Sequence, residues 1–359
     1  MTDENAFDHD LSSVMSNLGD SISLEPPSDP DLINTACESC LARVRNYRRR
    51  HPADDTPEVL SAFVSHLPLH GKKVMLKLVH ENATDTQLHQ IALHLTTAIL
   101  VPMKAGGGRT PNASVSPFEN AVEERDSWAG IMISSPTRSD QKRLKETCLV
   151  RDNHRCVLTG LWDIASVVEI PQLNKKAPTS PTQLVHIIPF SLGSYSGDTN
   201  RERDIAQKWA TLYAIFPGLY RLAQLEPDAI NTPKNAMTMI SALHEHFGKL
   251  EFSLESTEIE NTYHIELYPN FQSSGLLVHL PPPDQKGRRL VHFETSSGIE
   301  LPHPAILQTH AVLAKILHAS RKGEHIEKAI RDQDQLRCMA ADGSTDPLQI
   351  YIAYQLSVR

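Results

Sequence analysis

The sequence predicts an α+β protein in which a mixed segment, residues 139–282, lies between two helical regions. Two apolar stripes at helical spacing indicate the helical regions, one within 86–100 and the other within 305–317. Between them, short runs of β-branched and apolar residues alternate with helical stretches, and LVHII at 184–188 and AMTMI at 236–240 are two such runs. We therefore expect small sheets inside a largely helical chain.

The composition indicates a soluble globular protein. The chain has 359 residues, of which 40% are hydrophobic and 22% charged. Its longest apolar run, 91–103, is interrupted by His and Thr and is shorter than the roughly 20 residues of a membrane span. The acidic N-terminus lacks a secretory signal, and five sparse cysteines fit a reducing compartment. We expect an intracellular protein, in the nucleus or cytoplasm, with no membrane partner.

The N-terminal part divides into a tail and a helical region. Residues 1–30 hold seven acidic residues and no Lys or Arg, so we expect a disordered tail. Residues 31–104 are predicted to be an N-terminal helical region, whose strongest helix runs from about Thr86 to Leu100 and ends at Pro102. The apolar stripe of this helix consists of Leu88, Ile91, Leu95 and Ile99.

The rest of the chain is predicted to form three units. A Gly-, Pro- and Ser-rich stretch predicts a flexible linker over 105–138, and the mixed domain follows at 139–282. A C-terminal helical region is expected over 283–359, with one helix that begins at Pro304 and a second over 324–339. The β-leaning runs of the mixed domain are VVEI, LVHII, AMTMI, EFSLE, YHIEL and GLLVHL.

A single histidine, His186, interrupts the apolar run TQLVHIIPF at 182–190. A histidine in a core strand is often an ordinary buried residue bonded to a carbonyl, and that interpretation stays open. Two further polar residues follow in order: Asn235 opens a short strand pattern, and His244 falls nine residues later in a helix that Gly248 ends. The pattern is a strand with a histidine, a strand opened by an asparagine, and a helix with a second histidine.

This order resembles the ββα-metal finger of HNH endonucleases, and more narrowly the fungal HNH endonuclease-like proteins. The resemblance rests on RDNHRCVLTG at 151–160, HIIPF at 186–190 and the close formed by Asn235, Leu243, His244 and Phe247. It implies an HNH-type ββα finger embedded in a small mixed domain with helical flanks. It also implies that His186 is the base that activates water and that one divalent cation, Mg²⁺, Mn²⁺ or similar, holds the phosphate. Asn235 and His244 would ligate this metal or support the loop that carries the base.

The function implied by the resemblance is a metal-dependent endonuclease that hydrolyses nucleic-acid phosphodiester bonds with low sequence specificity. The chain departs from the family pattern at the metal, because Val185 and Gly248 stand where active relatives place further ligands. It also departs at the zinc that braces many HNH proteins. Only Cys156 of the four bracing cysteines is present, with Thr159, Ile240 and Leu243 at the other positions, so no structural zinc is expected.

These departures leave a second interpretation open: a degenerate HNH scaffold without nuclease activity, serving as an interaction module or recruited to small-molecule, secondary-metabolite chemistry in a fungus. The net charge of −8 argues against a general charge-driven nucleic-acid binder. An open basic groove over His186 and Asn235 would favour the nuclease, and an enclosed apolar pocket would favour the small molecule. The cations available for phosphate contacts, or for an ordinary solvated surface, are Lys142, Arg143, Lys145, Arg151, Arg155, Arg201 and Arg203.

Overall fold

The structure, a computed structural model, describes most of the chain from residue 30 to residue 328. The tail predicted to be disordered and the part of the predicted 324–339 helix beyond Lys328 lie outside the described residues. Inside this span the residues not described are 83, 106–111, 133–134, 171, 174–175 and 196–197.

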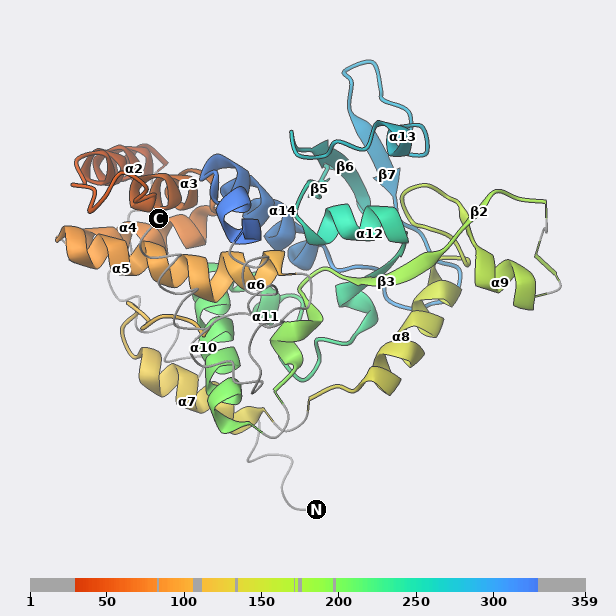
Figure 1. Cartoon of the computed structure of the whole chain (residues 1–359), viewed down its shortest axis with the longest axis horizontal. Helices are drawn as coiled ribbons and strands as arrows, with labels where there is room; N and C mark the ends of the chain where they lie inside the picture. Colours follow the sequence, from red (N-terminus) through yellow and green to blue (C-terminus); the bar gives the residue numbers. More distant parts are fainter. Residues whose placement is uncertain are drawn as a thin grey trace.

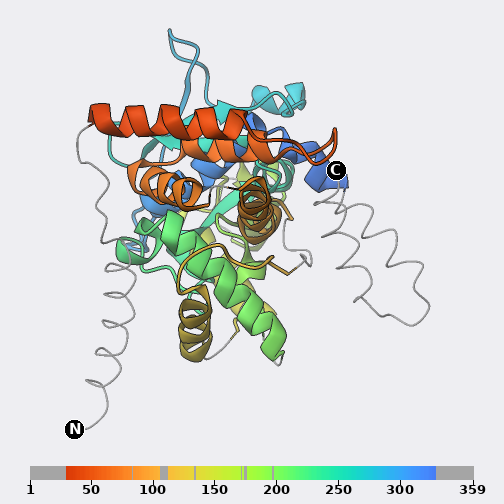
Figure 2. The same ribbon diagram turned by 90° about the vertical axis from the view of Figure 1, so that its left-hand side faces the viewer.

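The α+β prediction is confirmed, with small sheets in the middle of the chain and helices on both sides (Figure 1). Figure 2 shows α2 lying across the outside of the N-terminal helices, where it contacts α3 and α4. Among the described helices, none is both long and apolar enough to cross a membrane. The N-terminal elements are α2 (Pro30–Arg45), α3 (Thr56–His66), α4 (Leu69–Glu81), α5 (Asp85–Leu95), the π-helical η1 (Thr96–Leu100) and α6 (Val101–Lys104).

The expected helix end at Pro102 is wrong, because the helical run continues to Lys104. Proline lacks an N–H and normally breaks the bonding pattern of an α-helix. Here the turn before it is π-helical, and the N–H of Val101 bonds to the carbonyl of Thr96, five residues back. The predicted apolar stripe is buried throughout, with Leu88, Ile91, Leu95 and Ile99 all 0% exposed.

The stretch predicted to be a flexible linker contains a helix, α7 (Ala121–Ile131), which packs against α10 (Thr199–Ile215). Trp128 of α7 is only 1% exposed and lies against Tyr213 and Tyr220, with ring centroids 4.7 and 5.6 Å away. Composition predicted a loop here because Gly, Pro and Ser dominate the flanks of α7. A single large aromatic residue fixes the helix in spite of that composition.

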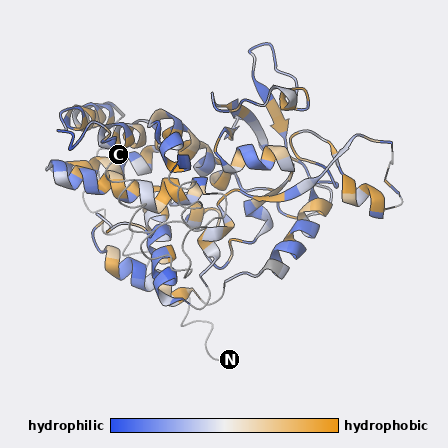
Figure 3. Ribbon diagram, viewed as in Figure 1, coloured by the Kyte–Doolittle hydropathy of each residue, from blue (hydrophilic) through white to orange (hydrophobic). Residues whose placement is uncertain are grey.

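The centre of the mixed domain is an antiparallel pair, β3 (Thr182–His186) and β4 (Ala236–Ile240), in which His186 lies opposite Ala236. Helix α12 (Ser241–Gly248) follows β4 and contacts both strands. Helix α8 (Arg138–Arg151) contacts both strands as well, and Figure 1 shows it below β3 with α12 above. Most of α8 is hydrophilic, with apolar residues toward its C-terminal end (Figure 3).

A second, three-stranded antiparallel sheet has the order β5–β6–β7, and two very short parallel strands, β1 and β2, pair beside α9. Two of the six β-leaning runs are not strands. The first three residues of VVEI are helical in α9, where the carboxylate of Asp163 caps the first turn, and the first half of GLLVHL belongs to α13. The elements are β1 (Trp162–Asp163), α9 (Ile164–Glu169), β2 (Thr179–Ser180), η2 (Phe190–Gly193), α11 (Gly218–Arg221), η3 (Pro233–Asn235), β5 (Phe252–Ser256), β6 (Thr262–Leu267), α13 (Ser274–Leu277) and β7 (Arg289–His292).

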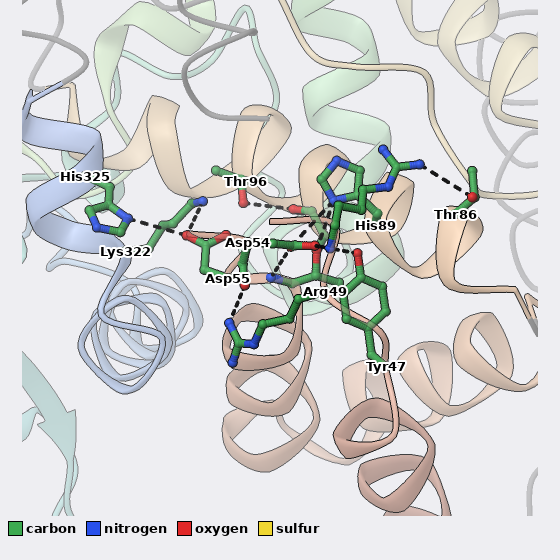
Figure 4. Close-up of polar contacts among 12 residues, drawn as sticks. Tyr47, Arg49, Asp54, Asp55, Thr86, His89, Thr96, Lys322 and His325 are labelled. Atoms are coloured by element: carbon green, nitrogen blue, oxygen red, sulfur yellow. Dashed lines mark hydrogen bonds and ion pairs between the residues drawn. The ribbon is translucent and has the colours of Figure 1, made fainter. Parts of the chain in front are cut away.

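Helix α14 (Pro304–Ala319) joins the two ends of the described chain, since it packs against both β5 and α3. Residues 322–328 are helical and are attached to the N-terminal region by charged groups. Lys322, 2% exposed, lies 2.5 Å from a carboxylate oxygen of Asp55, and Glu327 lies 2.8 Å from Lys104. Figure 4 shows the first of these pairs beside Tyr47 and His89. Buried apolar residues along the chain, from Cys40 to Ile326, also belong to one hydrophobic core.

Candidate functional site

His186 is the last residue of β3. Its Nε2 lies 3.0 Å from Oδ1 of Asn231, and its ring packs against Phe190 with centroids 5.4 Å apart. Burial lowers the pKa of His186 to about 4; the Asn231 bond opposes this shift, and nearby His244 adds to it. The ring is therefore neutral at neutral pH. Because the Asn231 oxygen accepts from Nε2–H, the lone pair is on Nδ1, which is the form that a general base needs.

Asn235 lies directly before β4 and is 0% exposed. Its Oδ1 accepts a hydrogen bond from the N–H of Ile188 at 2.9 Å, and its Nδ2 donates to the carbonyls of Ile188 and Ile230 at 3.0 and 2.9 Å. These bonds fix the chain two residues after His186. The resemblance implies that Asn235 is either a metal ligand or a support of the loop that carries the base. The contacts are those of a loop support, because the amide oxygen accepts from a backbone N–H.

His244 lies in the first half of α12, and its Nδ1 is hydrogen-bonded to Oε1 of Gln183 on β3. Burial lowers its pKa, and the charge of Glu245 opposes this effect. His186 and His244 line the same pocket, which is partly open to solvent and has a volume of about 510 Å³. The structure thus brings the two histidines to one cavity, while Asn235 holds the loop that follows His186.

Two paired strands followed by a helix, with His186, Asn235 and His244 at these positions, form a ββα unit. Residues 156–255 match a family model described as HNH endonuclease. This stretch, which we call the HNH domain, starts after α8 and ends with β5. No curated protein and no solved structure matches the chain.

Elements outside the HNH domain complete the pocket. Helix α8 contributes the exposed Lys142 and the half-buried Lys145, α6 contributes Met103, and α14 contributes His310. Neither lysine has an ion pair within the part of the chain that the structure describes. The described residues that line the pocket include no carboxylate. The lining of the pocket therefore combines its two HNH-domain histidines with two cationic side chains.

The residues of the pocket do not fit the divalent ion on which HNH domains generally depend. Val185 brings no donor atom, and a Cβ at Gly248 would meet nothing within 4 Å, so a ligand would have room there but the sequence supplies none. Across the described residues, no group of three or more His, Cys, Asp or Glu side chains is gathered as a metal site requires. The ammonium groups of Lys142 and Lys145 would also repel a cation.

The position of the bracing zinc is occupied by packed apolar side chains. Cys156, Ile240 and Leu243 are 1%, 3% and 0% exposed and belong to the same hydrophobic core. Thr159 precedes Gly160, whose positive φ of 69° closes the turn after Cys156. The contacts of Cys156 are thus those of a small core residue.

Two cations considered for phosphate contacts have other roles in the structure. Arg151 is 0% exposed, and its five N–H groups bond to Asp152 and to the carbonyls of Pro233, Ala236 and Glu300. It joins the end of α8 to β4 and is not available to a ligand. The guanidinium of Arg155 lies over the ring of Trp162, 3.9 Å from its centroid, and lines a different pocket.

Sequence reasoning missed two residues of the site. Asn231 orients His186, but an asparagine in a turn gives no signal of that role. His310 falls in a helix whose spacing predicts only an apolar face, and its position at the pocket depends on how α14 packs against the HNH domain. No local pattern encodes either contact.

Proposed function

We propose that the HNH domain and α8 bind the sugar–phosphate backbone of nucleic acid, and that this chain does not cleave it by the metal-dependent reaction of HNH endonucleases. The charge of the pocket is the observation that carries the proposal. Lys142 and Lys145 face a cavity whose described lining includes no carboxylate, so the pocket attracts an anion and not a cation. This is the scaffold interpretation, with nucleic acid as its partner.

The other features of the pocket agree with phosphate binding. His186 is held in one orientation by Asn231 and is neutral, so it can accept a hydrogen bond or a proton at Nδ1. Hydrolysis additionally requires positive charge that stabilises the pentacovalent transition state, which a divalent ion supplies where it is bound. Among the described residues of the pocket, the positive charge comes from Lys142 and Lys145. Two lysines can hold a phosphate, but they do not replace a divalent ion in the reaction. We therefore propose that the pocket binds nucleic acid and does not hydrolyse it efficiently.

Two other interpretations are less well supported. Metal-dependent cleavage is favoured by the HNH match and by the two histidines in one pocket. Against it, the described residues do not bring a third metal-binding side chain to these histidines. Small-molecule chemistry would be favoured by an enclosed apolar pocket, whereas this one is partly open and has two lysines in its wall. A nucleic-acid partner agrees with an intracellular location, in the nucleus or cytoplasm, which we propose with it.

Fluorescence anisotropy with labelled single- and double-stranded DNA and with RNA tests the proposal. We expect binding at low salt that EDTA does not change, because no metal takes part. The double variant Lys142→Gln/Lys145→Gln should reduce the slope of log affinity against log salt by roughly 2, because two fewer phosphates are neutralised. Lys286→Gln is the matched control, since Lys286 is exposed on the turn before β7, away from the pocket.

Two results would overturn the proposal. Nicking of a plasmid in Mg²⁺, Mn²⁺ or Ni²⁺ that EDTA stops and His186→Ala abolishes would restore the metal-dependent endonuclease. Equal binding by the double variant and by Lys286→Gln would show that nucleic acid does not use this pocket.

A further inference from the structure

His310 is a buried histidine of α14 in the wall of the pocket, and it lies outside the HNH domain. It is 2% exposed, and its ring stacks on Phe247 with centroids 3.8 Å apart and an interplanar angle of 4°. Its Nε2 lies 3.3 Å from the carbonyl oxygen of Phe247, while its Nδ1 is buried and has no hydrogen-bond partner among the described residues. A buried polar atom without a partner is uncommon and calls for an explanation.

The bond to Phe247 determines which nitrogen of the ring carries the hydrogen. A carbonyl oxygen only accepts, so Nε2 donates to Phe247 and Nδ1 keeps the lone pair. Burial lowers the pKa of His310 to about 3, so the ring is neutral at physiological pH. What Nδ1 lacks is therefore a hydrogen-bond donor, an N–H or an O–H.

The other two histidines of the pocket show the same pattern. His186 uses Nε2 to bond the amide oxygen of Asn231, and His244 uses Nδ1 to bond that of Gln183. Each of the three rings thus has one nitrogen bonded to a protein oxygen and the other left as an acceptor. Together with Lys142 and Lys145, the pocket offers ring acceptors beside two cationic donors.

A complementary ligand has an anionic group, several N–H or O–H donors and a flat apolar body. Inorganic phosphate has no apolar body to place against Phe190, and an apolar metabolite has no charge for the lysines. A nucleotide has all three features, in its phosphate, its sugar hydroxyl and base amino groups, and its base. The cavity of about 510 Å³ lies within the range of small-ligand sites, roughly 300–1,000 Å³.

We propose that this pocket holds one nucleotide unit, with its phosphate against Lys142 and Lys145 and a hydroxyl or amino group donating to Nδ1 of His310. The inference rests on the proposed function and makes it more specific, because it names the unit that is bound and a residue that recognises it. It also gives α14 a part in the site, although α14 lies outside the HNH domain. His310 and Met103 both line the cavity, and Nδ1 of His310 is buried, so the flexible side chain of Met103 has to move aside for a ligand to reach it.

Isothermal titration of the full chain with AMP, adenosine and inorganic phosphate tests this inference. We expect AMP to bind at least about tenfold more tightly than either fragment, since only AMP engages both ends of the site. His310→Phe retains a ring that can stack on Phe247 and removes the Nδ1 acceptor. It should weaken AMP binding about fivefold to tenfold, the loss of one hydrogen bond, and leave phosphate binding unchanged.

His318→Phe is the matched control. His318 is on the same helix, its ring stacks on Tyr268 with centroids 4.1 Å apart, and its Nε2 bonds the carbonyl of Leu250 at 2.8 Å. It does not line this pocket. Its substitution should leave both AMP and phosphate binding unchanged, so an equal effect of the two variants would assign the loss to α14 packing and overturn the role of His310.

A second measurement on the unsubstituted protein guards against a His310→Phe chain that fails to fold. The ¹⁵N resonance of His310 Nδ1 should move when AMP is added and stay in place with inorganic phosphate. An unmoved resonance, or AMP that binds no more tightly than phosphate, would refute the inference while oligonucleotide binding persists. Absence of oligonucleotide, AMP and phosphate binding together would remove the proposed function as well.

Discussion

The side chain of Asn235 matches its surroundings atom by atom. It meets one backbone N–H and two backbone carbonyls, and a primary amide supplies the one acceptor and two donors that these require. A carboxylate would place an acceptor against two carbonyls, and a histidine would not fit three partners at once. The residue type at this position is therefore explained by the loop after β3, without a cation.

Substitution of Asn235 tests this structural role. Asn235→Ala leaves three buried backbone groups without a partner, so it should lower the free energy of unfolding by about 2–4 kcal/mol. Asn231→Ala removes only the bond to the half-buried His186 and should cost about 1 kcal/mol. Urea unfolding of both variants measures the difference. If Asn235→Ala were as stable as the unsubstituted chain, its bonds would contribute nothing and the metal-ligand role would return.

At the residue scale, the sequence predicted which residues come together better than what they do. The order of His186, Asn235 and His244 placed all three at the β3–β4–α12 unit, because strand and helix patterns around them are local. Their hydrogen-bond partners are set by tertiary packing, which spacing does not encode. Phe247 and His310, for example, are stacked although 63 residues separate them.

At the element scale, α7 shows how one side chain overrides composition. The helix begins after Asn120, whose φ of 56° is left-handed, and it carries a run of five polar residues over 123–127. Trp128 is the one fully buried residue described in it, and its ring packs against those of Tyr213 and Tyr220. A Gly-, Pro- and Ser-rich segment with one tryptophan predicts a loop, because a periodic stripe is absent.

Substitution of Trp128 measures how firmly α7 is attached. Trp128→Ala should lower the free energy of unfolding by about 3–5 kcal/mol, as expected for removal of a buried aromatic ring. Hydrogen exchange of 121–131 should become faster as α7 detaches from α10. Trp162→Ala is the control: this ring is half-buried beneath Arg155, and its loss should cost about 1 kcal/mol. Equal costs for the two variants would mean that α7 is only loosely held.

At the scale of the whole molecule, several histidines are buried in the neutral form. Burial lowers the pKa of His94 and His186 to about 4 and that of His310 to about 3. These residues lie in α5, β3 and α14. Protonation of these histidines therefore affects the stability of the N-terminal helices, the HNH domain and the C-terminal helix in the same direction. His94 is held on both sides, by the Ser114 carbonyl and the Thr211 hydroxyl, each at 2.9 Å.

The sign of the pH dependence follows from these shifts. Below pH 6.5 the unfolded chain binds protons that the folded chain excludes, so stability is greatest above that pH and falls as pH decreases toward about 4. Glu124 acts in the opposite direction. Burial and the charge of Glu123 raise its pKa to about 7, so its contribution to the free energy of unfolding is present at low pH and is lost as the pH rises. Burial lowers the pKa of six further histidines, which adds to the first effect.

We therefore expect the free energy of unfolding to fall steadily between pH 6.5 and pH 4.5, by about 1.4 kcal/mol per pH unit for each net proton taken up. Urea unfolding at half-unit pH steps measures this slope. His94→Gln should reduce the slope by about one proton even if it lowers stability at every pH, because the group that resists protonation is gone. His279→Gln, at an exposed position, should leave the slope unchanged. A free energy that stays flat or rises as the pH falls over this range would show that burial does not keep these histidines neutral in the folded chain.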